Sequence, residues 1–280
     1  NLSPFEQQFQ EQRSFFTEGT ELFSKGNMFY SRRIGGSPSL YPNLSEDEKI
    51  IDFPGKVKLL NATKVSGRTQ KGLGIGVFNG ITEKMNATIK NDVTGEIRNE
   101  MVEPSANYNV IVLDQRFRGN SSVSFVNTNT LRSGNARDAN ASAFLYDITN
   151  KKNSYNFYGG LKSSWDSEPN AKIGINTFSG VYKVSGKHRF GTMLDYVDKN
   201  YNVDDLGYTG PTNYYAMYNN YSYRYLQPKG NINNLSVYVN VNLKRRIEPD
   251  IFYRMNINTN LNITNKKFQL PNNFNLNEHF

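Results

Sequence analysis

The stretch Leu235-Ser-Val-Tyr-Val-Asn-Val-Asn-Leu243 places an aliphatic residue at every odd position and a polar or aromatic one at every even position. A second stretch, 251–263, follows a similar alternation, with Asn at 256, 258, 260 and 262. Period-two alternation predicts a β-strand whose two faces meet very different surroundings. Strands of soluble proteins are usually about 5–6 residues long, whereas a tilted strand needs about 9–11 residues to cross a membrane. The length of both runs favours membrane-crossing strands.

The same alternation recurs from residue 56 onward. It predicts eleven strands, at 56–66, 72–90, 100–117, 121–131, 140–149, 154–163, 171–183, 188–197, 213–226, 231–243 and 250–263. A twelfth strand is predicted to begin near Phe268. Short connections such as 118–120 alternate with longer ones such as 91–99 and 198–212, as in outer-membrane barrels. We therefore expect an all-β fold: an antiparallel up-and-down transmembrane β-barrel, or part of one, of about 11–12 strands over residues 56–280.

The composition agrees with a barrel that has a wet interior. Only 37% of the 280 residues are apolar, yet the chain holds 18 Tyr and 18 Phe, which argues against disorder and for strands with one polar face. It has no Cys and only two His, which excludes disulfides and makes thiolate or multi-histidine metal sites untenable. No apolar run is long enough for a membrane-spanning helix. We expect no cofactor, no metal and no nucleic-acid partner.

Residues 1–55 differ from the rest and form a separate N-terminal segment, which we expect to be plug-like or periplasmic. Ser3-Pro4 predicts a helix start, the helix runs to Phe16, and Gly19 ends it. A mixed, strand-like run follows over 21–34, and 37–55 is predicted as loop. The segment holds five basic and eight acidic residues and so has a net charge of −3. Because the net charge of the whole chain is +8, residues 56–280 carry +11. Attraction into a basic lumen is therefore expected.

Several residues of the predicted strands and of the N-terminal segment are candidates for ligand or plug contacts: Arg32, Arg33, Gly74, Gly76, Gly80, Asp114, Arg116 and Arg224. The glycines share the face opposite Leu73 and Ile75, where missing side chains let another segment approach. The alternative is that they are ordinary barrel glycines. The charged residues of the strands are expected to point inward, where they tune selectivity or simply tolerate a wet interior. The arginine pair binds an anion or a carboxylate of the wall, or is merely solvated. No catalytic residue is predicted.

Some stretches resemble a known family. They are Leu2-Ser-Pro-Phe-Glu6, Glu11-Gln-Arg-Ser-Phe-Phe-Thr-Glu-Gly19, Leu22-Phe23, Phe29-Tyr-Ser-Arg-Arg-Ile-Gly35, Lys71-Gly-Leu-Gly-Ile-Gly-Val-Phe-Asn79, Val102-Glu-Pro104 and Asp205-Leu-Gly207. Together they resemble an uncharacterised family of Bacteroidota outer-membrane proteins, in which a β-barrel domain of unknown function usually follows a domain similar to carbohydrate-binding family nine. The resemblance covers most of the chain. It implies an outer-membrane location, an upstream domain and later barrel strands that lie outside these residues, and it supplies no catalytic residue.

The expected function is binding, transport or an assembly-subunit role in the outer membrane, with glycans as the ligand class that the resemblance suggests. The expected partners are outer-membrane lipid, lipopolysaccharide and other outer-membrane protein subunits. Two alternatives stay open: an outer-membrane hydrolase that uses a pair of lumenal carboxylates about 5–10 Å apart, and a soluble glycan-binding β-protein.

Overall fold

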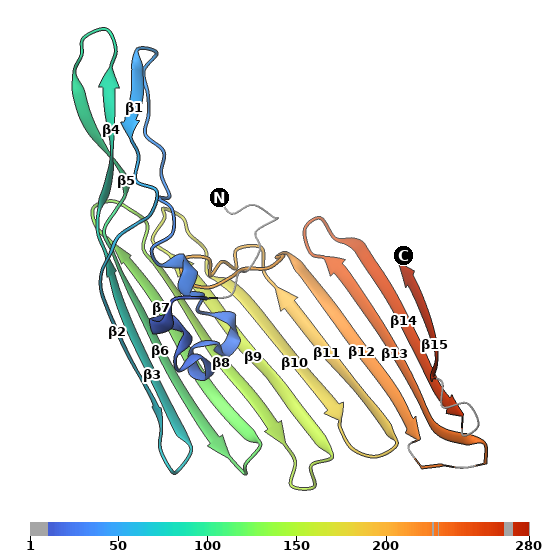
Figure 1. Cartoon of the computed structure of the whole chain (residues 1–280). Helices are drawn as coiled ribbons and strands as arrows, with labels where there is room; N and C mark the ends of the chain where they lie inside the picture. The colour runs from blue at the N-terminus through green and yellow to red at the C-terminus, as the bar shows by residue number, and fades with distance from the viewer. Residues whose placement is uncertain (1–10, 226, 229, 266–270, 280) are drawn as a thin grey trace.

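The computed structural model describes residues 11–225, 227–228, 230–265 and 271–279. Its main feature is one antiparallel sheet of 12 strands, drawn in Figure 1 from the cyan β2 to the red β15. Each strand pairs with its neighbour in chain order, apart from the step from β3 to β6. The strands are β2 (Leu59–Arg68), β3 (Leu73–Thr82), β6 (Ala106–Phe117), β7 (Ser121–Arg132), β8 (Ala139–Thr149), β9 (Tyr155–Asp166), β10 (Gly174–Lys183), β11 (His188–Val197), β12 (Tyr214–Tyr225), β13 (Ile232–Arg246), β14 (Ile251–Asn265) and β15 (Pro271–His279).

The all-β antiparallel prediction is confirmed, and most predicted strands lie within a few residues of the observed ones. Among the described residues β2 and β15 are the edge strands and do not pair with each other, so this part of the chain forms an open sheet. No helix in the described ranges is long and apolar enough to cross a membrane.

The two longest predicted strands are wrong. The predicted strand 72–90 is divided into β3 and β4 (Met85–Asn91), and 100–117 is divided into β5 (Ile97–Glu103) and β6. Pro104 explains the second break, because proline has no N–H to give to a ladder. Residues 91–99 therefore form the end of β4, the turn and the start of β5 in one hairpin. They are not a loop between two strands of the 12-stranded sheet, which we call the wall.

That hairpin belongs to a second, three-stranded sheet of order β1-β4-β5. Strand β1 (Glu48–Asp52) lies in the range predicted as loop, so that prediction is wrong for these five residues. The Arg98 guanidinium, paired with Glu48 at 2.7 Å and with Glu100, joins β1 to β5 across β4. Figure 1 shows this small sheet projecting beyond the ends of the wall strands.

The two faces of the 12-stranded sheet differ as the alternation predicts. On β6, Tyr108, Val110, Val112 and Asp114 are buried, and we call this side the covered face. On the opposite side, the outer face, large apolar side chains stay exposed along almost every strand. They include Ile75, Val77, Ile111, Leu113, Phe125, Phe144, Phe157, Leu161, Trp165, Ile175, Val181, Phe190, Leu194, Tyr196, Tyr215 and Met217.

Residues 11–34 lie against the covered face (Figure 1) and contain short helices only. These are α1 (Ser14–Thr17), α2 (Thr20–Phe23), η1 (Lys25–Asn27) and η2 (Ser31–Arg33). The strand-like prediction for 21–34 is wrong, because Gly19 and Gly26 adopt φ of 61° and 67° and turn the chain where a strand would continue. Residues 4–10 of the predicted helix 4–16 lie outside the described residues, and within the described part residues 14–16 are helical.

The core lies between residues 16–34 and the covered face. Phe16, Leu22, Phe23, Met28 and Ile34 form one buried cluster with wall residues of β3, β6, β7 and β8. Phe78 is at its centre, 1% exposed, with its ring 5.3 Å from Phe29 and 5.8 Å from Phe16 between centroids. This single side chain links two separate parts of the N-terminal segment to the wall.

We expect Phe78→Ala to lower the free energy of unfolding by about 3–5 kcal/mol, because it leaves a cavity where three aromatic rings meet the wall. The matched control is Phe125→Ala, which removes the same side chain from the outer face, where it is 41% exposed. Urea unfolding followed by near-UV circular dichroism measures both. An equal cost for the two variants would contradict the position assigned to Phe78.

Candidate functional site

Asp114 holds the N-terminal segment at one end of the covered face. Its carboxylate is fully buried, accepts a hydrogen bond from the Ser124 hydroxyl at 2.7 Å, and pairs with Lys25 Nζ at 2.9 Å and with Arg68. Arg68 and Arg116 also pair with Glu21 of α2. Lys25 and Glu21, two oppositely charged residues of the N-terminal segment, thus pair with one cluster of charged residues on the sheet. Buried charges of this kind are stable only when paired and hydrogen-bonded.

The glycines of β3 give that segment room. A Cβ on Gly74 would lie 2.8 Å from Leu22 Cδ2, and one on Gly76 would lie 3.2 Å from the Phe23 ring. Gly80 differs, because its nearest neighbour is the ring of Phe78, at 2.9 Å. The first two glycines therefore admit α2 directly, and the third admits the aromatic side chain on which the segment packs.

The long loop 198–213 covers the segment from the other side. Tyr201, Val203 and Leu206 are buried in the same core cluster as Met28 and Ile34. The Asp205 carboxylate accepts hydrogen bonds from Arg132 at 2.7 Å and from Arg137 at 2.9 Å. The adjacent residue, Asp204, pairs with Arg33 at 3.2 Å. Ion pairs to the wall and to the segment thus fold this loop inward.

Between these parts lies a cavity of about 380 Å³, which we call the inner cavity. Its walls come from the N-terminal segment, from β9 to β12 and from the long loop. The lining residues are Gly26, Asn27, Tyr158, Lys162, Asn176, Phe178, Met193, Asp195, Val197, Tyr201, Tyr208, Thr209, Gly210, Pro211 and Tyr214. Five aromatic rings thus surround a small number of polar groups, the usual composition of a small-molecule site.

The polar groups of the inner cavity converge on Asp195. One carboxylate oxygen accepts a hydrogen bond from the Asn176 amide at 3.0 Å, and the other from the Tyr214 hydroxyl at 2.8 Å. Lys162 donates to the Gly26 carbonyl at 2.8 Å, which ties β9 to the N-terminal segment. Each carboxylate oxygen accepts more than one hydrogen bond and an ammonium group has three donors, so both residues keep capacity for a ligand.

The groups that line the inner cavity are suited to binding a ligand through hydrogen bonds and ring contacts. Asp195 is the only carboxylate among the described residues that line it, whereas glycoside hydrolysis by two carboxylates requires a pair. In the described part of the chain no group of three or more His, Cys, Asp or Glu is placed to hold a metal ion. Burial raises the pKa of Tyr201, so its hydroxyl stays protonated and acts as a neutral hydrogen-bonding group.

The structure brings most of the candidate residues together, but not all. Arg33, Asp114, Arg116, Gly74 and Gly76 all contact the N-terminal segment or the loop over it, whereas Gly80 faces the ring of Phe78. Arg224 lies at the far end of β12, with its guanidinium over the Tyr238 ring and its Nε without a hydrogen-bond partner among the described residues. Arg32 is exposed and lines a different cleft, with Arg13 and Lys56.

Sequence reasoning missed Lys162, Asp195 and the Asp205 cluster. Lys162 and Asp195 carried a detectable signal, because each is a charged residue on the inward face of a predicted strand. Asp205 belongs to a stretch that carries the family resemblance, but it lies in the long connection 198–212, where no strand pattern indicates which way its side chain points.

A comparison with protein-family models matches residues 1–279 to DUF5916, a domain of unknown function. The chain belongs to the DUF5916 family. No curated protein and no solved structure matches it. The family therefore defines what the chain is related to, and the chemistry has to be inferred from the site.

Glu11 fastens the start of the described N-terminal segment. Its carboxylate accepts hydrogen bonds from the Arg13 guanidinium at 2.8 and 2.9 Å and from the Ser31 hydroxyl at 2.6 Å. Arg13 in turn donates to the Ile34 carbonyl. These bonds, led by the one from Arg13, lower the pKa of Glu11 to about 2.

We expect this attachment to loosen in acid. A carboxyl group whose pKa is lower in the folded state contributes stability above its unfolded pKa and loses it as pH falls through the folded value. For Glu11 that window runs from 4.5 down to about 2. Pepsin cleavage between residues 11 and 34 should accelerate across this window in the wild type, and Glu11→Gln should be cleaved rapidly at its upper end. Equal cleavage of the two proteins at pH 4.5 would contradict the role given to Glu11.

Proposed function

We propose that this chain forms the wall of an outer-membrane β-barrel, or a large part of one, which binds and transports a glycan and whose lumen is occupied by the N-terminal segment. The observation that carries the proposal is the outer face. Its large apolar side chains are exposed on strands of 10 to 12 residues, β3 and β6 to β12. Monomeric soluble proteins rarely expose apolar patches larger than a few hundred Å², whereas a membrane barrel requires such a band.

Aromatic side chains support the same placement. On the outer face, Trp165, Tyr196 and Tyr215 lie at the ends of their strands next to the longer loops. Tyr155 and Phe157 lie next to the short turn that precedes β9. Two aromatic girdles that border an apolar band are characteristic of transmembrane barrels, because these side chains suit the membrane–water interface.

Binding followed by transport is favoured over open diffusion. Residues 16–34 and loop 198–213 bury a common core against β3 and β6 to β8, so they obstruct the covered side. The inner cavity beneath them offers flat aromatic rings beside a carboxylate, an amide and an ammonium group. Sugars present both apolar C–H faces and many hydroxyls, which fits this mixture, so glycans are the ligand class we favour.

The alternatives are less well supported. A hydrolase that uses a pair of carboxylates would need a partner for Asp195 in the cavity. A soluble glycan-binding β-protein would have to expose the whole outer face to water. Partner subunits of the outer membrane remain part of the proposal, because edge strands β2 and β15 have one unpaired side among the described residues. Lipid and lipopolysaccharide are the surroundings proposed for the outer face.

Membrane extraction and surface labelling test the location. We expect the protein to be released from membranes only by detergent. Single cysteines are easily introduced because the chain has none. Val93→Cys, in the projecting small sheet, should react with a membrane-impermeant maleimide on intact cells, whereas Lys152→Cys, in a short turn, should react only after lysis. Release by alkaline carbonate without detergent would refute the membrane location, and labelling of position 152 alone would reverse the orientation.

Conductance in planar bilayers tests the occlusion. We expect the wild type to conduct poorly, and Asp114→Asn to conduct more, because losing the buried carboxylate removes the ion pair of Lys25 and leaves Arg68 with Glu21 alone, at a cost of about 3–5 kcal/mol. Asp147→Asn is the matched control, since Asp147 contacts Asn156 of the adjacent strand. Deletion of residues 11–34 should open the pore further. A wild type that already conducts like an open porin, with no change on deletion, would refute occlusion.

A further inference from the structure

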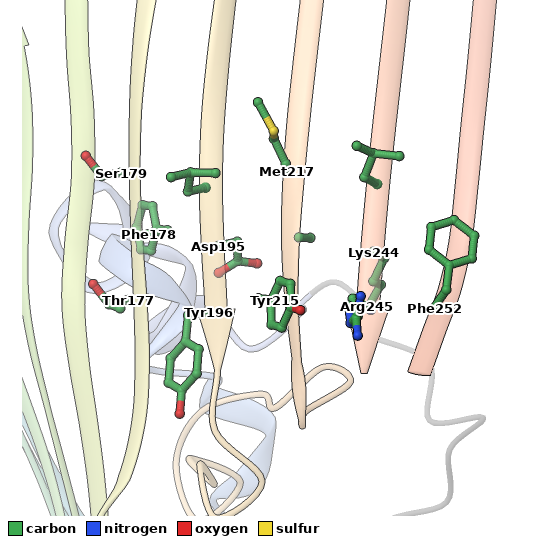
Figure 2. A pocket seen from close by; sticks show the side chains of 13 residues that line it. Thr177, Phe178, Ser179, Asp195, Tyr196, Tyr215, Met217, Lys244, Arg245 and Phe252 are labelled. Atoms are coloured by element: carbon green, nitrogen blue, oxygen red, sulfur yellow. The ribbon is translucent and has the colours of Figure 1, made fainter. Parts of the chain in front are cut away.

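The inward side of β12 to β14, next to the inner cavity, has an unusual lining. The register places three residues of each strand in three cross-strand rows, and none of these nine side chains is charged or aliphatic. They share the side of the sheet that carries Asp195. Figure 2 shows the opposite side of the same strands, with Tyr215 and Met217 toward the viewer and the N-terminal segment behind. We call the nine residues the amide grid; its rows are Tyr218, Asn242 and Asn256; Asn220, Asn240 and Asn258; and Ser222, Tyr238 and Asn260.

Four amides of the grid are available to a ligand. Asn220, Asn240, Asn242 and Asn256 have no side-chain hydrogen-bond partner in the part of the chain that the structure describes. Asn220 is exposed and the other three are half-buried, so all four are accessible. A primary amide has one acceptor oxygen and two N–H donors. The grid therefore presents donors and acceptors side by side, without a charge among them.

Beside the grid, the ring of Tyr182 lies flat against the sheet. A Cβ on Gly191, in the adjacent strand β11, would lie 2.1, 2.6 and 2.7 Å from three atoms of this ring, and one on Gly180 would lie 2.9 Å from a fourth. Only glycine at these two positions lets the ring approach the backbone so closely. The ring lies in the central row of the grid, because Gly191 pairs with Tyr182 on one side and with Asn220 on the other.

The Tyr182 ring and the grid are continuous with the inner cavity. The ring of Tyr158, which lines the cavity, is 5.5 Å from the Tyr182 ring between centroids. Met193, another residue of the cavity lining, pairs with Tyr218 of the grid. A ligand chain that leaves the cavity on this side therefore meets the ring and then the amides.

We propose that the amide grid and the Tyr182 ring bind an uncharged oligosaccharide that extends from the inner cavity across β12 to β14. The assignment rests on the proposed function and deepens it, because it names the class of glycan and the residues that hold its chain. A ring that lies flat on the sheet turns its other face away from the backbone, which suits the apolar C–H face of a sugar. The neighbouring amides donate to and accept from the sugar hydroxyls.

The dimensions of the grid favour a chain of several sugars. From residue 218 to residue 222 the grid is about 13 Å long, and its three strands make it about 10 Å wide. This area is larger than one sugar ring. Water alone does not account for the arrangement, because the face of an aromatic ring is poorly hydrated and two glycines are needed to lay it on the sheet.

The charges around the grid favour an uncharged ligand. Four cations border it without entering it: Arg189, Arg224, Lys244 and Arg254. The Arg224 guanidinium lies over the Tyr238 ring, the Lys244 ammonium lies over the Tyr214 ring, and Arg189 donates to the Gly186 carbonyl. A charged sugar would lose water at the grid without meeting an opposite charge there, whereas hydroxyls exchange their hydrogen bonds with water for equivalent ones with amides.

Native mass spectrometry tests the site in lauryldimethylamine oxide, a detergent without a sugar headgroup. The probes are maltohexaose, cellohexaose, xylohexaose and mannohexaose, their disaccharides, and hexagalacturonic acid. We expect one neutral hexasaccharide per chain to be retained, about tenfold more tightly than its disaccharide and than hexagalacturonic acid, the difference that one or two further hydrogen bonds supply. Tighter retention of hexagalacturonic acid would overturn the assignment to uncharged glycans.

Three variants locate the binding. Asn240→Leu removes the central amide, Tyr182→Leu removes the ring, and Gly191→Ala displaces the ring without removing any group that contacts the sugar. Each should weaken hexasaccharide binding by roughly tenfold and leave disaccharide binding in the inner cavity unchanged. The matched controls are Asn129→Leu, on the outer face of β7, and Gly67→Ala, where a Cβ meets nothing within 4 Å. Neither control should alter sugar retention, and circular dichroism checks that every variant is folded.

The outcomes separate this site from the function on which it rests. Equal loss in the grid and control variants, or no loss in any of them, would overturn the proposal. A dimer that forms without sugar and is broken by Asn240→Leu would assign this face to a second copy of the chain. Disaccharides retained as tightly as hexasaccharides would refute the grid and leave the inner cavity as the glycan site. A protein that retains no sugar at all would refute the proposed glycan function itself.

Discussion

A wide sheet must remove apolar side chains on two faces from water, and the rest of this structure follows from how each face is covered. On the covered face the chain supplies its own cover: residues 16–34 and loop 198–213 bury the aliphatic and aromatic side chains of β3 and β6 to β8. On the outer face the described residues supply none, and large apolar side chains stay exposed. Burial of hydrocarbon is the dominant favourable term in folding. The exposed apolar side chains of the outer face are the observation on which the proposed membrane location rests.

Ion pairs fix the position of residues 16–34 and of loop 198–213 on the covered face. Packing alone would let a short, weakly helical segment slide over an apolar wall, because the hydrophobic effect is non-directional. Asp114 and Asp205 remove that freedom: the first binds Lys25 of the segment, and the second binds the loop to Arg132 and Arg137. Both carboxylates are almost fully buried, so an unpaired state would be costly. The inner cavity lies between the segment, the loop and the strands β9 to β12.

The two hollows of the sheet follow from its two environments. The inner cavity mixes aromatic rings with hydrogen-bonding groups that point toward a shared centre at Asp195. A groove of about 620 Å³ on the outer face, over β10 to β14, is lined mainly by aliphatic and aromatic side chains, with Arg245 at one end. Because successive residues of a strand point to opposite faces, both draw on the same short stretches of β10 to β12. One set of strands thus provides a polar site on one side and an apolar one on the other.

The sequence by itself determined most strands of the 12-stranded sheet, their antiparallel order and the alternation of side chains between its two faces, because period-two alternation is a local property. It also predicted, as one of two alternatives, that Gly74 and Gly76 leave room on the inward face. It did not determine that 21–34 is helical rather than strand-like, since its apolar residues fit either form until the wall selects one.

Nor could the sequence place β1 beside β4 or fold loop 198–213 inward. Those arrangements depend on ion pairs such as Arg98 with Glu48, 50 residues apart, and Arg132 with Asp205, 73 residues apart. Only the tertiary structure decided them, because a charge in the sequence does not identify its partner until the chain has brought the two together.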